Sequence, residues 1–133
     1  MAQYLLGIDN GNTVSKAALF DLKGREVAVA SCKVETEYPH PGWTERNMDA
    51  MWQSTASAIR EVIAKSGAKP EEIAGIGNTG HGNGVYLLDK QGKPLRNGIQ
   101  SMDSRAADVV AEWGQTGLHA RVFPFTIHSF WPA

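Results

Sequence analysis

Short apolar runs open the chain and predict three strands joined by tight turns. They cover residues 5–9, 15–21 and 26–34, with polar residues between them. Their connections are only a few residues long, which suits antiparallel neighbours. Two prolines and a glycine then interrupt any regular structure over residues 35–45. The pattern therefore predicts an antiparallel meander followed by a loop.

The apolar residues next recur at the spacing of one helix face, which predicts a helix over residues 48–66. Asn47 or Asp49 is suited to cap its start, and Gly67 is suited to end it. The residues expected on the inward face are Met51, Trp52, Thr55, Ile59, Val62 and Ile63. This helix is interpreted as support for the core.

Beyond the helix, the pattern predicts a strand over residues 74–79, its continuation over 85–88 and a short strand over 99–101. A second helix is predicted over 104–115. Its expected inward residues are Ala107, Val110, Ala111 and Trp113. Residues 118–133 show no clear period. The whole pattern predicts an α/β fold, with an α+β-like meander plus helices.

The connection between the first two strands carries the most distinctive chemistry. Asp9 ends the first strand, and the turn that follows contains Gly11, Asn12 and Thr13, with Lys16 just beyond. Such a turn can present backbone N–H groups to phosphate oxygens. The Thr13 hydroxyl adds a further donor, and Lys16 adds a positive charge. A carboxylate at the position of Asp9 suits a hydrated Mg²⁺ ion. An ordinary hairpin with a polar tip is the alternative that spacing alone leaves open.

Composition narrows the class of protein. The chain has 133 residues, of which 42% are hydrophobic and 20% charged, as in an ordinary globular domain. Its formal net charge of −1 indicates no electrostatic surface for nucleic acid or an anionic membrane. A single cysteine, Cys32, excludes an intrachain disulfide, fits a reducing cytoplasm and is interpreted as a small core residue. No apolar run is long enough to span a membrane, and no signal peptide is expected.

Three stretches in order resemble the FGGY family of carbohydrate kinases. Residues 7–16, with the pattern Gly-Ile-Asp-x-Gly followed by Lys, resemble the first phosphate motif of the actin, hexokinase and Hsp70 superfamily. Residues 41–45 are similar to the family's Gly-Trp-x-Glu segment. Residues 76–89 and 103–105 are similar to its sugar-binding strand and Asp-x-Arg motif. The pentulose kinases of the family are the most similar, and the resemblance runs over nearly the whole chain.

The resemblance implies an actin-like ATPase domain of the ribonuclease H-like class, truncated. Residues 1–133 would be the N-terminal portion of the first of two such domains. ATP and Mg²⁺ are the implied cofactors, with Asp9 at the metal. The implied phosphate-binding residues are Gly11, Asn12, Thr13 and Lys16, and the implied sugar-binding residues are His81, Gly82, Asn83, Asp103 and Arg105. The family's catalytic base and adenosine pocket lie further along the chain, so no catalytic base is expected before residue 133.

The sugar-binding stretch has the chemistry that a polyol needs, which is directional donors and acceptors. Pentulose kinases often show Gln-Met-His at this place; Asn83 matches their histidine, and Gly82 stands for the bulky Met. The alternative to sugar binding for His81 is a purely structural role. For Asp103 the alternative is to cap the start of the second predicted helix. Trp43 either stacks on a ligand or packs its loop onto the domain.

The resemblance implies that the full-length protein phosphorylates a ketose, specifically a pentulose, with ATP. The single cysteine fits a cytoplasmic location for that protein. The 133-residue chain alone is expected to be inactive. It is also expected to self-associate, because aromatic residues crowd its C-terminal end. Sugar and ATP are the expected partners, without nucleic acid or membrane. A non-catalytic ATP-dependent switch or scaffold of the actin and Hsp70 superfamily and a degenerate structural remnant are the alternatives. The histidines lack the spacing of a zinc site.

Overall fold

The chain forms two compact units, described over residues 3–133 by a computed structural model. The first unit runs to Glu35 and continues over Asn47–His81. The second consists of Thr36–Arg46 and Gly82–Ala133. Strands and helices occur in both units, and the predicted α/β class is confirmed.

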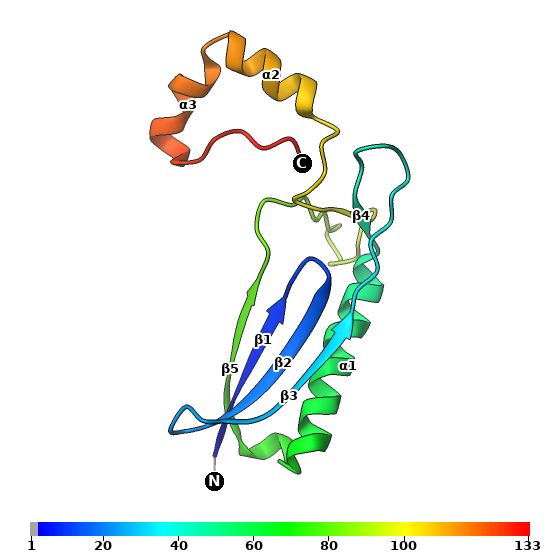
Figure 1. Cartoon of the computed structure of the whole chain (residues 1–133), viewed down its shortest axis with the longest axis vertical. Helices are drawn as coiled ribbons and strands as arrows, with labels where there is room; N and C mark the ends of the chain where they lie inside the picture. Colours follow the sequence, from blue (N-terminus) through cyan, green and yellow to red (C-terminus); the bar gives the residue numbers. More distant parts are fainter. Residues whose placement is uncertain (1–2) are drawn as a thin grey trace. The chain divides into compact units, whose positions relative to one another are not determined.

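A four-stranded sheet is the frame of the first unit (Figure 1). Its strands are β1 (Tyr4–Asn10), β2 (Val14–Asp21), β3 (Glu26–Lys33) and β5 (Ile73–Gly80), in the spatial order β3-β2-β1-β5. The first three form the antiparallel meander, and β5 lies parallel to β1. The four strands that the sequence pattern predicts here are confirmed to within one residue at each end.

The connection from β3 to β5 contains the long helix α1 (Met48–Ser66) and the short 3₁₀ helix η1 (Pro70–Glu72). Asn47 caps α1, because its side-chain oxygen accepts the Ala50 N–H at 2.8 Å. Gly67 ends it in the left-handed conformation, with φ at 67°, where other residues are strained. Both predicted helix ends are confirmed.

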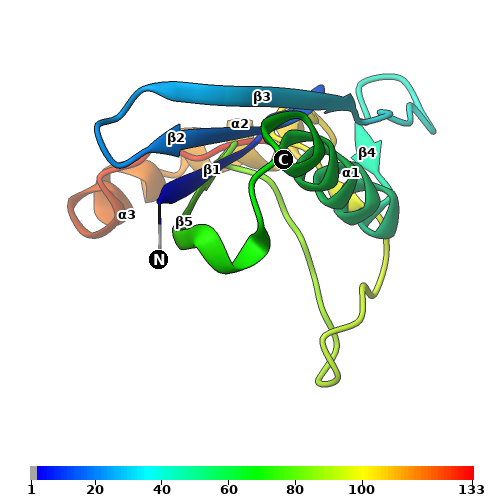
Figure 2. The ribbon, with the colours of Figure 1, turned by 90° about the horizontal axis from the view of Figure 1, so that it is seen from below.

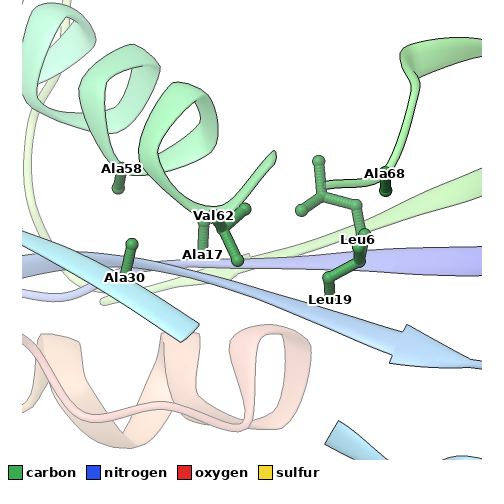
Figure 3. Close-up of a cluster of buried hydrophobic side chains, with 7 residues drawn as sticks. All are labelled: Leu6, Ala17, Leu19, Ala30, Ala58, Val62 and Ala68. Atoms are coloured by element: carbon green, nitrogen blue, oxygen red, sulfur yellow. The ribbon is translucent and has the colours of Figure 1, made fainter. Parts of the chain in front are cut away.

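The core of the first unit lies between α1 and the sheet, since α1 covers one face of β2 and β3 (Figure 2). Alternation along β2 turns Ala17 and Leu19 to this face and Lys16 to the other. Cys32 packs at the margin of the core, which confirms its interpretation as a small core residue. The buried apolar side chains that form one cluster here, drawn in Figure 3, are Leu6, Ala17, Leu19, Ala30, Ala58, Val62 and Ala68.

Trp52 does not join this core, and its predicted place on the inward face of α1 is wrong. Its exposed fraction is 63%. The buried stripe of α1 consists of Thr55, Ala58 and Val62. At about 100° of rotation per residue, Trp52 lies about 90° around the helix from the centre of that stripe.

The second unit contains short elements. Strands β4 (Glu45–Arg46) and β6 (Gly98–Ile99) form an antiparallel pair. Helices α2 (Ala107–Gln115) and α3 (Leu118–Thr126) follow. Helix α3 occupies much of residues 118–133, where the sequence showed no clear hydrophobic period. Within residues 3–133, no helix combines the length and apolar character needed to cross a membrane.

Three expectations for the second unit need correction. Residues 85–88 are not a strand, because only isolated bridges from Val85 and Leu88 form there. Helix α2 begins at Ala107 rather than at residue 104. None of the residues of α2 is fully buried, so its predicted inward face is wrong; Trp113, 39% exposed, instead has an edge contact with the Phe130 ring at 5.0 Å between centroids.

Candidate functional site

Three neighbouring strands of the first unit bring Asp9, Lys16 and Thr79 into one row. Asp9 on β1 pairs with Lys16 on β2 and with Thr79 on β5. Residues paired in this way share a face of the sheet, here the face opposite α1. All three line an open pocket of about 620 Å³. The other lining residues are Gly7, Ile8, Ala18, Glu26, Val29, Gly77 and Asn78.

The hairpin turn beyond this row is closed by its own backbone. The Gly11 N–H donates to the Val14 carbonyl oxygen at 3.1 Å, and the Thr13 carbonyl oxygen accepts the Val34 N–H at 3.0 Å. A Cβ on Gly11 would lie 3.0 Å from the Val14 oxygen, so the turn has little space for a side chain there. Because the Gly11 amide is used within the turn, the Thr13 hydroxyl and the Lys16 ammonium group are the more suitable phosphate donors.

His81 ends the first unit, directly after β5. Its backbone N–H donates to the Asn10 carbonyl oxygen at 3.1 Å, and its ring Nδ1 lies 2.9 Å from the same oxygen. Gly82 and Asn83, the next candidate sugar-binding residues, begin the second segment of the second unit. Asn83 has φ at 59°, a left-handed conformation that asparagine tolerates better than most residues.

Asp103 and Arg105 form a tight pair inside the second unit. The carboxylate of Asp103 is buried and accepts four hydrogen bonds from the chain. Three come from Arg105, through its backbone N–H, Nε and one terminal nitrogen, at 2.7–2.9 Å. The fourth comes from the Thr44 N–H at 2.7 Å. Asp103 does not cap α2, whose N-cap is Ala106, so that alternative is wrong.

The same hydrogen bonds determine the protonation of this pair. Burial alone would raise the pKa of Asp103, but the hydrogen bonds from Arg105 and Thr44 and the Arg105 charge together lower this pKa to about 2. The hydrogen bond to Asp103 in turn raises the pKa of Arg105, and a further bond to Glu45 adds to this. Both side chains are therefore charged at neutral pH.

The Arg105 guanidinium also joins two motifs that are distant in sequence. It donates to Glu45 Oε1 at 2.9 Å, and its central carbon lies 3.9 Å from the centre of the Trp43 ring. Arg96 pairs with the same glutamate oxygen. The Gly-Trp-x-Glu and Asp-x-Arg motifs are thus one cluster, in which Trp43 packs on a cation within the domain.

The chain matches the N-terminal domain profile of the FGGY family of carbohydrate kinases over residues 4–133. The chain belongs to this family. It is 41% identical to an L-xylulose/3-keto-L-gulonate kinase of Escherichia coli, over 98% of the chain and 26% of that protein. It is likewise 41% identical to a probable L-xylulose kinase of Pasteurella multocida, over 96% of the chain and 26% of that protein. The resemblance to FGGY carbohydrate kinases that the sequence suggested is thus confirmed. The kinases of this family are phosphotransferases.

Solved structures agree with this family assignment. A xylulose kinase of Rhodospirillum rubrum superposes with a TM-score of 0.81 at 32% identity, over 91% of the chain and 25% of that structure. The predicted actin-like ATPase fold, of the ribonuclease H-like class, is thereby confirmed. The chain spans about a quarter of the length of the curated relatives that it matches.

The structure adds site residues that the sequence reasoning missed. Thr79, Asn78 and Glu26 line the pocket beside Asp9. The contact between the Asn10 carbonyl oxygen and His81 was likewise not predicted, although the turn that begins at Asn10 was. The strand register that places Thr79 opposite Asp9 joins residues seventy positions apart, so no local pattern indicates it. The sequence did predict a strand over residues 74–79. Pairing that strand with the first one would have placed Thr79 near Asp9.

Proposed function

We propose that the full-length protein is an ATP-dependent kinase of a ketose, and specifically of a pentulose such as L-xylulose. The row formed by Asp9, Lys16 and Thr79 at an open pocket is the observation that carries the proposal. It combines a carboxylate, an ammonium group and a hydroxyl, which are the groups that position a nucleotide phosphate and its metal ion. The similarity to L-xylulose kinases supports the proposed sugar class.

A magnesium ion fits the donor set of this row. Mg²⁺ binds proteins through one or two carboxylates together with substrate phosphates and water, and Asp9 supplies one exposed carboxylate in the pocket. Among residues 3–133, no three His, Cys, Asp or Glu side chains gather as a metal cage. When bound, the ion would neutralise phosphate charge. Lys16 and the Thr13 hydroxyl would hold the phosphate oxygens, beside Gly11 and Asn12 in the turn.

The sugar-binding role is proposed for His81, Gly82, Asn83, Asp103 and Arg105. Nε2 of His81 and the side-chain amide of Asn83 are groups that can hydrogen-bond sugar hydroxyls, and a Cβ on Gly82 would meet no atom within 4 Å. The Asp103 carboxylate already accepts four hydrogen bonds from the chain, so we propose that it serves sugar binding indirectly, by holding Arg105 in a fixed orientation.

The chemistry also needs a base that takes the proton of the attacking hydroxyl group. We place this base, and the adenosine pocket, in the part of the protein beyond residue 133. Residues 1–133 are then the N-terminal portion of the first kinase domain. The single Cys32 suits a cytoplasmic protein in which thiols stay reduced.

The experiment is a coupled assay of ADP release by the full-length protein, with L-xylulose, other ketopentoses and glycerol offered separately. Release that depends on a ketopentose, with glycerol far weaker, supports the proposal. ATP hydrolysis without dependence on any sugar would indicate a nucleotide-driven switch instead. A preference for glycerol would support kinase activity but refute a pentulose as the substrate.

A further inference from the structure

Asn10 is the last residue of β1, and its side chain joins two other elements of the first unit. Its Oδ1 accepts the Thr55 hydroxyl of α1 at 2.7 Å, and its Nδ2 donates to Asn78 Oδ1 of β5 at 3.2 Å. The single Thr55 proton has three acceptors in range. Asn10 is the nearest, because the others lie at 3.0 and 3.3 Å. The end of β1 is therefore fixed from both sides.

The Asn10 backbone holds His81. Its carbonyl oxygen accepts the His81 backbone N–H and also lies 2.9 Å from Nδ1 of the ring. A carbonyl oxygen has no proton to donate, so Nδ1 must carry the hydrogen of this bond. In the neutral ring, the acceptor lone pair is then on Nε2.

Gly80 makes this close contact possible. It pairs with Asn10 across the parallel strands β5 and β1. A Cβ on Gly80 would lie 3.1 Å from the Asn10 carbonyl oxygen and 3.4 Å from the Asn10 Cβ. The separation from the oxygen is tighter than most real Cβ contacts, and the separation from the Asn10 Cβ is at the lower limit of ordinary contact. A side chain at position 80 would therefore push the carbonyl group away from His81.

We propose that Asn10 is a positioning residue that fixes His81 as its Nδ1–H tautomer and links it to the candidate phosphate site. The link to catalysis rests on the proposed function; the tautomer does not. Asp9, the candidate metal ligand, directly precedes Asn10, so a shift of the end of β1 displaces the metal ligand and His81 together. Displacements of about 1 Å in such groups change rates strongly. The phosphate motif allows any residue at position 10, so the role proposed for Asn10 rests on its contacts alone.

The first test reads the tautomer directly, with imidazole ¹⁵N shifts of the 133-residue chain at a pH where the ring is neutral. His81→Gln assigns the signal. We expect the Nδ1–H form in the wild type and a gain of the Nε2–H form in Gly80→Ala. Gly75→Ala on the same strand is the matched control, because its Cβ would meet only Leu5 Cδ2 at an ordinary 3.7 Å. A wild-type ring in the Nε2–H form, or equal spectra for the two alanine variants, would overturn the proposal.

The second test uses the full-length protein and a residue outside the binding machinery. Thr55→Val removes the hydroxyl that holds Asn10 but keeps the side-chain shape, whereas Thr55→Ser keeps the hydroxyl. We expect Thr55→Val to raise the KM for the ketose and to lower kcat, with kcat/KM reduced about tenfold. Thr55→Ser should stay within about twofold of the wild type.

The two tests separate the possible failures. If Thr55→Val is only less stable to urea, with unchanged kinetics for the folded enzyme, the link to catalysis is refuted. If the wild type phosphorylates no ketose, the proposed function fails, and the ¹⁵N spectra still decide the tautomer. Should Gly80→Ala not fold, Thr55→Val replaces it in the spectra, and it must gain the Nε2–H form relative to Thr55→Ser.

Discussion

Replacing Asp103 by Asn tests the buried cluster of the second unit. The pKa of Asp103 is lowered from 3.8 to about 2 in the folded chain. At about 1.4 kcal/mol per pH unit, the ionised carboxylate contributes about 2 kcal/mol to the free energy of unfolding at pH 7. Asp103→Asn removes this charge and turns an N–H₂ group toward donors, so we expect a total loss of about 2–4 kcal/mol.

The pH dependence gives the prediction its sign. Because the folded pKa lies below the unfolded one, the contribution is fully present above about pH 5. It is lost as the pH falls through 3.8 toward 2. The wild type should therefore lose stability over this window by about 2 kcal/mol more than Asp103→Asn does. The difference between the two proteins is large at neutral pH and shrinks in acid.

Urea unfolding followed by tryptophan fluorescence at pH 7, 4 and 2.5 measures this difference, and Trp43 in the cluster is one of the four tryptophans that contribute to the signal. Glu112→Gln is the control, since it removes an exposed carboxylate on α2. Its difference from the wild type should stay small at all three pH values. If the free energies of unfolding of the wild type and Asp103→Asn differ by the same amount at pH 7 and at pH 2.5, the reasoning is refuted.

Three further predictions concern activity and association. In the full-length protein, Asp9→Ala should reduce turnover at least about a hundredfold without unfolding it, because the metal ligand is lost; near-normal kcat would remove Asp9 from the mechanism. Gly82→Met should change the ranking of ketoses by kcat/KM more than the KM for ATP; equal losses for all substrates would make this stretch scaffold. The 133-residue chain should show no sugar-dependent ADP release and should form dimers or larger species in light scattering, because β5 is an edge strand and Phe125 is 87% exposed; an active monomer would contradict this.

Local sequence signals predicted the first unit well. Asn47 and Gly67 fix the ends of α1 through short-range hydrogen bonds and backbone conformation, so its bounds were readable from the sequence. The β1–β2 hairpin likewise follows from its own turn. In residues 85–88, an apolar run was present without a partner strand to pair with, and the pattern alone cannot supply one.

The candidate site was predictable only where it is local. Asp9 and Lys16 belong to one hairpin and were identified together. Asn10 and Thr79 depend on contacts with segments far along the chain, which a single sequence does not reveal. The Asp103–Arg105 motif was recognised, but its union with Glu45 required the fold.

The parallel pairing of β1 with β5 has a consequence for the order in which the pocket is assembled. The Asp9–Lys16 side closes through a hairpin, an event of microseconds for an isolated chain. Thr79 reaches the row only after the whole connection through α1 has folded back, a distant closure that slows folding. We therefore expect a nascent or partly unfolded chain to form the β1–β2 turn, the candidate phosphate-binding turn, before Thr79 completes the pocket. Nucleotide affinity would develop with the docking of α1 and β5 rather than with the hairpin.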